Sequence, residues 1–103
     1  TDNTMNIKIH SIHFDADTKL LEFINKKVSR IENFFDRIIG AEVYLKLEGN
    51  NSVHDKVAEI KVSIPGKVLF SEEKSKVFEE SVDSALESIL RQIKRHKEKE
   101  RHE

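Results

Sequence analysis

The chain has 103 residues, of which 37% are hydrophobic and 36% are charged, and its formal net charge is −1. These proportions suit one small domain with a single core, and the lack of cysteine excludes disulfides, thiolate nucleophiles and thiolate metal sites. No apolar run approaches the roughly 20 residues that cross a bilayer and no signal-peptide pattern opens the chain, so we expect a soluble, cytoplasmic protein without a membrane partner.

The first predicted elements are a strand and a helix. Residues 5–11 alternate apolar and polar side chains, which is typical of a strand with one buried face. Asp17 is a suitable N-cap, and over residues 18–35 the apolar side chains recur every three or four positions, which predicts an amphipathic helix. We place the single domain at residues 5–101 and treat residues 1–4 as a remnant or a disordered start.

Three more strands are predicted after this helix. Residues 41–48 and 58–64 alternate in the same way as the first strand. Pro65-Gly66 suits the two central positions of a type II turn, because proline fixes φ and glycine accepts a positive φ. Residues 67–71 should therefore return as an antiparallel fourth strand.

A second amphipathic helix is predicted over residues 76–96 or beyond. The order β-α-β-β-β-α, with one apolar face on the sheet and one apolar stripe on each helix, predicts an α+β two-layer sandwich with both helices on the same face. Because a β-α-β crossover is right-handed and usually joins parallel neighbours, the first two strands should be parallel and the others antiparallel. The sheet is thus expected to be four-stranded and mixed.

Charge is sorted both around and along the two helices. On the first helix, four cations fall on one flank of the apolar stripe: Lys19, Lys26, Lys27 and Arg30. On the second helix, the acids occupy the first half: Glu79, Glu80, Asp83 and Glu87. The cations crowd the second half: Arg91, Lys94, Arg95, Lys97, Lys99 and Arg101. A helix dipole explains charges only in the first and last turns, so the pattern also favours a shared cationic surface for nucleic-acid phosphates.

Other candidate sites are weak. His10 and His13 stand three positions apart, where strand side chains point to opposite faces, so we expect no metal site. An acid-base enzyme needs paired titratable groups in a concave site, whereas the many carboxylates here lie on outward positions, and the chain has no glycine-rich phosphate loop. We therefore expect no catalytic residues, no cofactor and no small-molecule substrate. Phe23, Phe34 and Phe35 could stack on bases, although aromatics at helical spacing usually belong to the core. Three histidines are expected to be solvated: His54, His96 and His102.

Two segments resemble one known family. Residues 20–38 (LLEFI, then Lys27 and Arg30, then FFDRI) resemble the first helix of bacterial ribosome hibernation promoting factors, also called ribosome-associated inhibitor or sigma-54 modulation proteins. Residues 91–99 (RQIKRHKEK) resemble the end of that family's second helix. The resemblance covers about residues 5–101, and β-α-β-β-β-α is the family's topology. The chain resembles the short form, which lacks the additional C-terminal domain through which long forms pair ribosomes.

The resemblance implies a partner and a set of contacts. The family binds the small ribosomal subunit at its decoding region, in the channel of messenger and transfer RNA, and silences ribosomes in stationary phase or stress. Carried over by motif, six residues would contact ribosomal RNA phosphates: Lys27, Arg30, Arg37, Arg91, Arg95 and Lys97. Geometry alone adds two more: Lys26 and Lys94.

The chain departs from the family pattern at three positions. Leu21 stands where the family often carries Arg. The pattern Asp-x-Tyr-x-Ala-Ile-Asp reads VFEESVD over residues 77–83, so Val77 and Glu79 replace the first Asp and the Tyr, while Asp83 is kept. If the lost side chains contact the ribosome in relatives, Glu79 would alter or weaken that part of the interface.

The function predicted from these observations is translation inhibition by occlusion of the decoding channel, without catalysis. Two alternatives stay open. The first is a protein-interaction module that regulates a transcription factor through the acidic half of the second helix. The second is a general double-stranded RNA-binding domain, which would read the A-form shape of any duplex.

Overall fold

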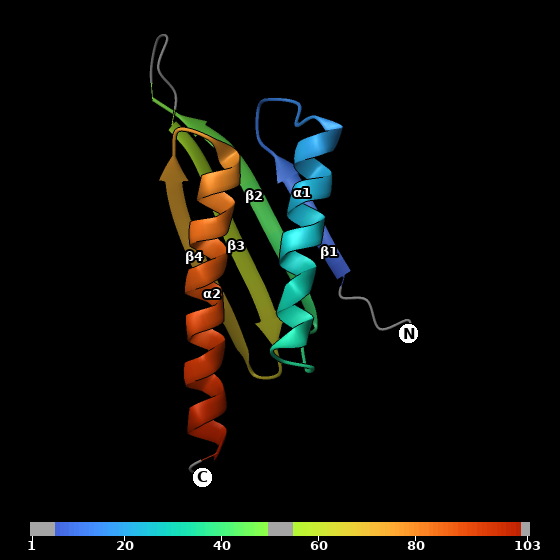
Figure 1. Cartoon of the computed structure of the whole chain (residues 1–103), viewed down its shortest axis with the longest axis vertical. Coiled ribbons are helices and arrows are strands. Elements are labelled where there is room, and N and C mark those ends of the chain that lie inside the picture. Colours follow the sequence, from blue (N-terminus) through green and yellow to red (C-terminus); the bar gives the residue numbers. More distant parts are fainter. Residues whose placement is uncertain (1–5, 50–54, 102–103) are drawn as a thin grey trace.

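A computed structural model describes residues 6–49 and 55–101 of the chain (Figure 1). The elements follow one another as β1 (Asn6–Ser11), α1 (Thr18–Ser29), the 3-10 helix η1 (Arg30–Asn33), β2 (Gly40–Glu48), β3 (Asp55–Ile64), β4 (Lys67–Ser75) and α2 (Phe78–Arg101). The predicted order β-α-β-β-β-α is confirmed. Among the described residues, no helix is both long and apolar enough to cross a membrane.

The four strands form one sheet in the order β1-β2-β3-β4. β1 runs parallel to β2, whereas β2 and β3, and β3 and β4, are antiparallel. The register places Ile9 beside Val43, Val43 beside Ile60, and Ile60 beside Ser71, so one face of the sheet gathers the inward side chains of every strand. The predicted mixed sheet is therefore confirmed.

Both helices lie side by side on this face, with α1 over β1 and β2 and α2 over β3 and β4 (Figure 1). The core between the two layers is mostly aliphatic, with Ile24 of α1, Ile60 of β3 and Ile89 of α2 all fully buried, and it also includes Phe35 and Phe78. Each such side chain contributes about 1.5–3 kcal/mol by leaving water. The predicted two-layer α+β sandwich is confirmed by this arrangement.

Local signals at the start of α1 and between β3 and β4 act as the sequence predicts. Asp17 caps α1, because its Oδ1 accepts a hydrogen bond of 2.8 Å from the backbone N–H of Leu20. Gly66 has a φ of 77°, the value that the second central position of a type II turn requires. The turn delivers Lys67 opposite Ile64 and so starts β4 in register.

The first helix is shorter than predicted. α1 ends at Ser29, and the chain continues as the tighter η1. The prediction of a single helix over residues 18–35 was therefore wrong. The Ser29 hydroxyl donates to the carbonyl of Lys26 at 3.0 Å, and the N–H of Phe34 bonds the carbonyl of Ile31, three residues back. Both contacts favour the 3-10 geometry, which ends the helix while the apolar spacing persists.

The last two elements also differ from prediction at their ends. β4 continues past residues 67–71 to Ser75, because residues 56–59 of β3 pair with its polar second half. α2 begins at Phe78, two residues later than predicted, and continues to Arg101. Alternation of apolar residues cannot detect a strand end made of charged side chains, which is why β4 was predicted too short.

Candidate nucleic-acid interface

The cationic ends of both helices lie at the same end of the molecule. α1 and α2 run in the same direction, and the turn between β3 and β4 lies at their C-terminal end (Figure 1). Lys26, Lys27 and Arg30 lie at or just after the last turn of α1, and the cations of α2 begin at Arg91 and continue to its C-terminal end. The acidic start of α2 lies at the opposite end.

The uncovered face of the sheet has a different electrostatic character. Lys46 of β2 lies 2.6 Å from Glu59 of β3 and 3.7 Å from Glu72 of β4, and Lys74 lies 3.5 Å from Glu48. The hydrogen bond to Glu59 and the neighbouring carboxylates raise the pKa of Lys46 above its ordinary value of 10.5, against a smaller opposing effect of desolvation. Two of the cations on this face, Lys46 and Lys74, are thus paired with carboxylates of the same sheet.

Five of the eight predicted site residues keep their charges available. Their side chains are exposed and make no ion pair or hydrogen bond with any described residue: Lys26, Arg30, Arg91, Lys94 and Arg95. An exposed cation without a partner carries its full charge toward solvent, where it can attract phosphate at little desolvation cost.

Lys27 is different, because it connects the two helices. Its Nζ lies 3.4 Å from Oδ1 of Asp83 on α2 and 5.6 Å from the ring centroid of Phe23 on α1. Of the four cations on the basic flank of α1, Lys27 thus contacts α2 directly. The ion pair also gives Asp83, the acid retained from the family pattern, a role within this fold.

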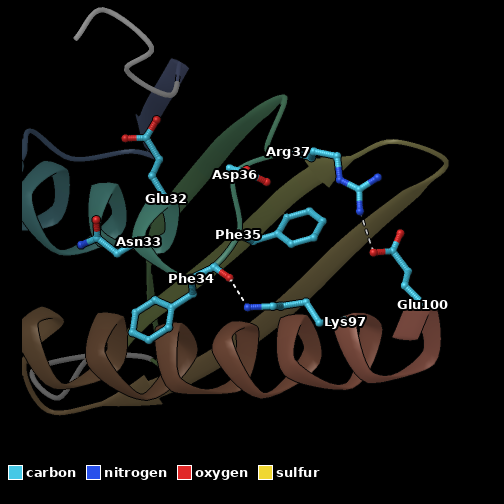
Figure 2. Close-up of a pocket in the computed structure, with 8 residues that line it drawn as sticks. All are labelled: Glu32, Asn33, Phe34, Phe35, Asp36, Arg37, Lys97 and Glu100. Carbon is cyan, nitrogen blue, oxygen red and sulfur yellow. Dashed lines mark hydrogen bonds and ion pairs between the residues drawn. The ribbon is translucent and has the colours of Figure 1, made fainter. Parts of the chain in front are cut away.

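Arg37 and Lys97 fasten the segment after η1 to the end of α2 (Figure 2). Lys97 Nζ donates a hydrogen bond of 2.7 Å to the carbonyl of Phe34, and Arg37 Nη2 donates one of 2.7 Å to Oε1 of Glu100. The Arg37 guanidinium also lies 5.4 Å from the ring centroid of Phe35. Two of the residues predicted to contact phosphates, Arg37 and Lys97, thus have partners within the protein. The partner of Arg37 is Glu100, which the sequence did not single out.

His96 belongs to the same cluster. Its ring meets Phe35 edge to face with 5.6 Å between centroids, and its Nε2 lies 3.4 Å from Glu100. The expectation that His96 is solvated was wrong, because its position three residues after the buried Ile93 places it beside the apolar stripe of α2, against Phe35. His54 and His102 lie outside the described residues.

The three phenylalanines divide between core and surface. Phe35 is buried, and Phe23 is half-buried against the core. Phe34 keeps 51% of its surface exposed and borders a pocket of about 380 Å³ with Leu90, Lys94 and other side chains of α2. Only one of the three aromatics therefore presents its ring beside exposed cations. Helical spacing cannot separate them, because the chain leaves the α-helix before residue 34.

At the departures from the family pattern, Val77 and Glu79 are exposed, whereas Ser81 is fully buried. The hydroxyl of Ser81, which replaces an alanine of the pattern, donates to the carbonyl of Lys56 on β3. A buried hydroxyl is tolerated when it has such a partner, so this change is accommodated inside the fold.

Histidines 10 and 13 do not converge. His10 lies on the outer face of β1, where its ring stacks on Tyr44 at 4.7 Å and its Nε2 lies 3.5 Å from Glu42. His13 follows the strand in a bend with a positive φ of 65°. No described histidine, aspartate or glutamate belongs to a group of three that could hold a metal ion.

Comparison with known proteins places the chain in a family. The model of the family described as sigma 54 modulation protein / S30EA ribosomal protein matches residues 7–101. A ribosome hibernation promoting factor from Pseudomonas putida is 28% identical over 96 residues, covering 93% of this chain and 90% of that protein. The factor of the same name from Escherichia coli is 26% identical, covering 92% and 96%.

A longer relative and two solved structures agree with this match. The ribosome hibernation promotion factor of Bacillus subtilis is 29% identical, and the chain spans 50% of its length. The N-terminal domain of Protein Y from Thermus thermophilus superposes with a TM-score of 0.77 at 28% identity, covering 89% of this chain and 99% of that one. A ribosomal subunit interface protein from Coxiella burnetii shares the fold, with a TM-score of 0.79 at 22% identity, covering 90% and 98%. This chain is a member of the sigma 54 modulation protein / S30EA ribosomal protein family.

Proposed function

We propose that the protein is a ribosome hibernation factor that binds the small subunit at its decoding region and blocks access of messenger and transfer RNA. Family membership and relatives named ribosome hibernation promoting factor support the ribosome as partner. The decoding region and the phosphate contacts are implied by the family resemblance and supported by the distribution of charge.

The main supporting observation is the contrast between the two faces of the molecule. The helical face exposes five predicted site cations that have no ion-pair partner among the described residues, whereas the sheet face pairs two of its cations, Lys46 and Lys74, with its own carboxylates. A net charge of −1 would give little attraction to RNA if it were spread evenly. Because the cations are instead concentrated on the helical face, they form a positive surface that attracts phosphates without reading bases.

Inhibition then needs no chemistry. A rigid α+β domain held in the channel by phosphate contacts excludes messenger and transfer RNA by its volume. Affinity comes from the release of counterions as each cation neutralises a phosphate, so binding should weaken steeply as salt is added.

The rival protein-interaction module would use the acidic half of α2, and the structure leaves that half partly engaged. Asp83 pairs with Lys27, and Glu80 accepts a hydrogen bond from the hydroxyl of Ser75. Two of the four acids thus have internal partners, whereas none of Arg91, Lys94 and Arg95 has an ion-pair partner among the described residues, which favours a polyanion as partner.

The test is co-sedimentation of the purified protein with small ribosomal subunits. The double variant Arg91→Glu with Arg95→Glu should fold normally, because both side chains are exposed, and should fail to sediment with the subunits. A matched control is Lys8→Glu with Lys76→Glu, which changes net charge equally on the sheet and at the far end of α2.

Binding by the control and not by the arginine variant supports the proposal. Continued binding by the arginine variant contradicts it, and loss of binding in both would show a response to net charge instead of to this surface. Equal affinity of the wild type for a plain RNA duplex and for the subunit would favour the general double-stranded RNA binder.

A further inference from the structure

A second cationic cleft lies on the side of α2 away from α1. It has a volume of about 380 Å³ and is formed between α2 and the start of β4. Four of its lining residues are cations: Lys67 from β4 and Arg91, Arg95 and Lys99 from α2. None of the described lining residues is a carboxylate, and none of the four cations has an ion-pair partner among the described residues.

The spacing of the three cations on α2 costs the helix stability. Arg91, Arg95 and Lys99 follow one another at intervals of four residues, so like charges are neighbours on one ridge about 6 Å apart along the axis. Lys67 adds a fourth positive charge from the sheet. The helix dipole favours a cation at Lys99 in the last turn, but it does not account for Arg91, Arg95 and Lys67 beside it. A strand of nucleic acid supplies phosphates along its backbone that could pair with all four.

The cleft is held open by contacts within the protein. Gln92 Nε2 donates a hydrogen bond of 2.8 Å to the carbonyl of Phe70 on β4 and lies 3.3 Å from the hydroxyl of Ser88. This tether fixes the separation between α2 and β4, with the buried side chain of Leu69 among the lining residues. The four cations therefore border a preformed site, which lowers the entropic cost of binding.

We propose that this cleft binds the phosphate backbone of one RNA strand, so that Lys67 and Lys99 extend the cationic surface from Arg91 and Arg95 toward β4. The inference rests on the proposed function and deepens it, because α2 would then be gripped by RNA on both flanks. It assigns binding roles to Lys67 and Lys99, of which Lys67 lies outside the charge patterns of both helices. Phosphate oxygens are the recognised chemistry, and they can come from RNA or from a free anion.

The test compares Lys67→Gln with Lys99→Gln against the control Lys8→Gln with Lys76→Gln, each lowering net charge by two. In co-sedimentation with small subunits, the cleft variant should bind about tenfold more weakly than the control. The slope of log affinity against log salt should fall by about 1.5, since each phosphate contact contributes roughly 0.7–0.9. Inorganic phosphate is titrated in parallel, with NMR shifts of the Lys67 and Lys99 amides as the readout.

Each outcome decides between distinct conclusions. Weaker binding and a smaller slope, without saturable shifts from inorganic phosphate, support the RNA strand. Unchanged binding of the cleft variant, while Arg91→Glu with Arg95→Glu still abolishes binding, overturns the cleft and leaves the proposed function standing. Saturable phosphate binding with unchanged subunit affinity would assign the cleft to a free anion and overturn the RNA assignment. Failure of the wild type to bind subunits overturns both proposals.

Discussion

Lys97 Nζ donates a hydrogen bond of 2.7 Å to the carbonyl oxygen of Phe34, across 63 positions of sequence. The contact joins the end of α2 to the segment that follows η1, and the Arg37–Glu100 ion pair closes the same junction one turn later (Figure 2). A cation at this position therefore supports the fold as well as the charge of the surface. Its two roles can be separated by measuring stability and binding on the same variants.

Replacing Lys97 by Met should lower the free energy of unfolding by about 0.5–1 kcal/mol, because an exposed charged donor loses its backbone acceptor. Lys94→Met removes one cation from an exposed position of α2 that makes no such bond, so its effect should stay within about 0.5 kcal/mol of zero. Urea unfolding measures both values. Equal stability of the two variants would show that the Lys97 bond contributes nothing to folding.

The difference between these two lysines could not have been predicted from the sequence. Periodicity places Lys94 and Lys97 on α2. It also predicts which face of the helix packs on the sheet, since apolar side chains mark that face. The partner of Lys97 depends on where the chain turns after η1. That turn is set by the hydrogen bond from the Ser29 hydroxyl to Lys26 and by the backbone hydrogen bonds to the carbonyl of Ile31, neither of which leaves a periodic pattern in the sequence. The fold was therefore predictable from apolar patterns, whereas the pairing of cations was not.

The adjacent pair Phe34 and Phe35 should show opposite sensitivities to truncation. Phe35→Ala leaves a cavity beneath His96 and Arg37 and should cost about 3 kcal/mol of unfolding free energy. Phe34→Ala removes a ring that is 51% exposed and should cost less than about 1 kcal/mol. Thermal or urea unfolding gives both numbers, and comparable losses at the two positions would contradict the assignment of Phe35 to the core and Phe34 to the surface.

Asp83→Asn should move stability and ribosome affinity in opposite directions. Loss of the 3.4 Å pair with Lys27 should lower the free energy of unfolding by about 0.2–1 kcal/mol. The same change frees the Lys27 charge beside the cationic surface and should strengthen binding to small subunits severalfold at low salt. A Lys27→Met, Asp83→Asn double-mutant cycle isolates the pair from the two separate substitutions. Weaker binding of Asp83→Asn would favour the acidic half of α2 as a contact surface.

Lys46 on the sheet face should contribute to stability in a pH-dependent way. Its pKa is raised in the folded state by the hydrogen bond to Glu59 and by neighbouring carboxylates, so the folded protein holds this proton more tightly than the unfolded chain. The contribution is therefore fully present below the ordinary value of 10.5 and is lost as pH rises through the higher folded value. Wild type and Lys46→Met should differ in unfolding free energy at pH 8, and the difference should shrink above about pH 10.5.

A difference that stays constant through the alkaline range would assign the effect of Lys46→Met to packing of the aliphatic stem instead of to charge. Ribosome binding should be unaffected at neutral pH, because Lys46 lies on the face away from the helices and already has two carboxylate neighbours.

The flank of α1 and the end of α2 should act as one surface toward RNA. Lys26 of α1 and Arg30 of η1 are exposed and have no internal partner among the described residues, and Lys27 beside them faces α2. Lys26→Gln with Arg30→Gln should therefore reduce the slope of log affinity against log salt by about 1.5, as expected for two lost phosphate contacts. Lys8→Gln with Lys76→Gln should leave the slope unchanged, since neither residue borders that surface. If the α1 variant keeps the wild-type slope while substitutions at Arg91 and Arg95 reduce it, phosphate binding resides on α2 alone, and α1 serves to position that helix through the Lys27–Asp83 pair.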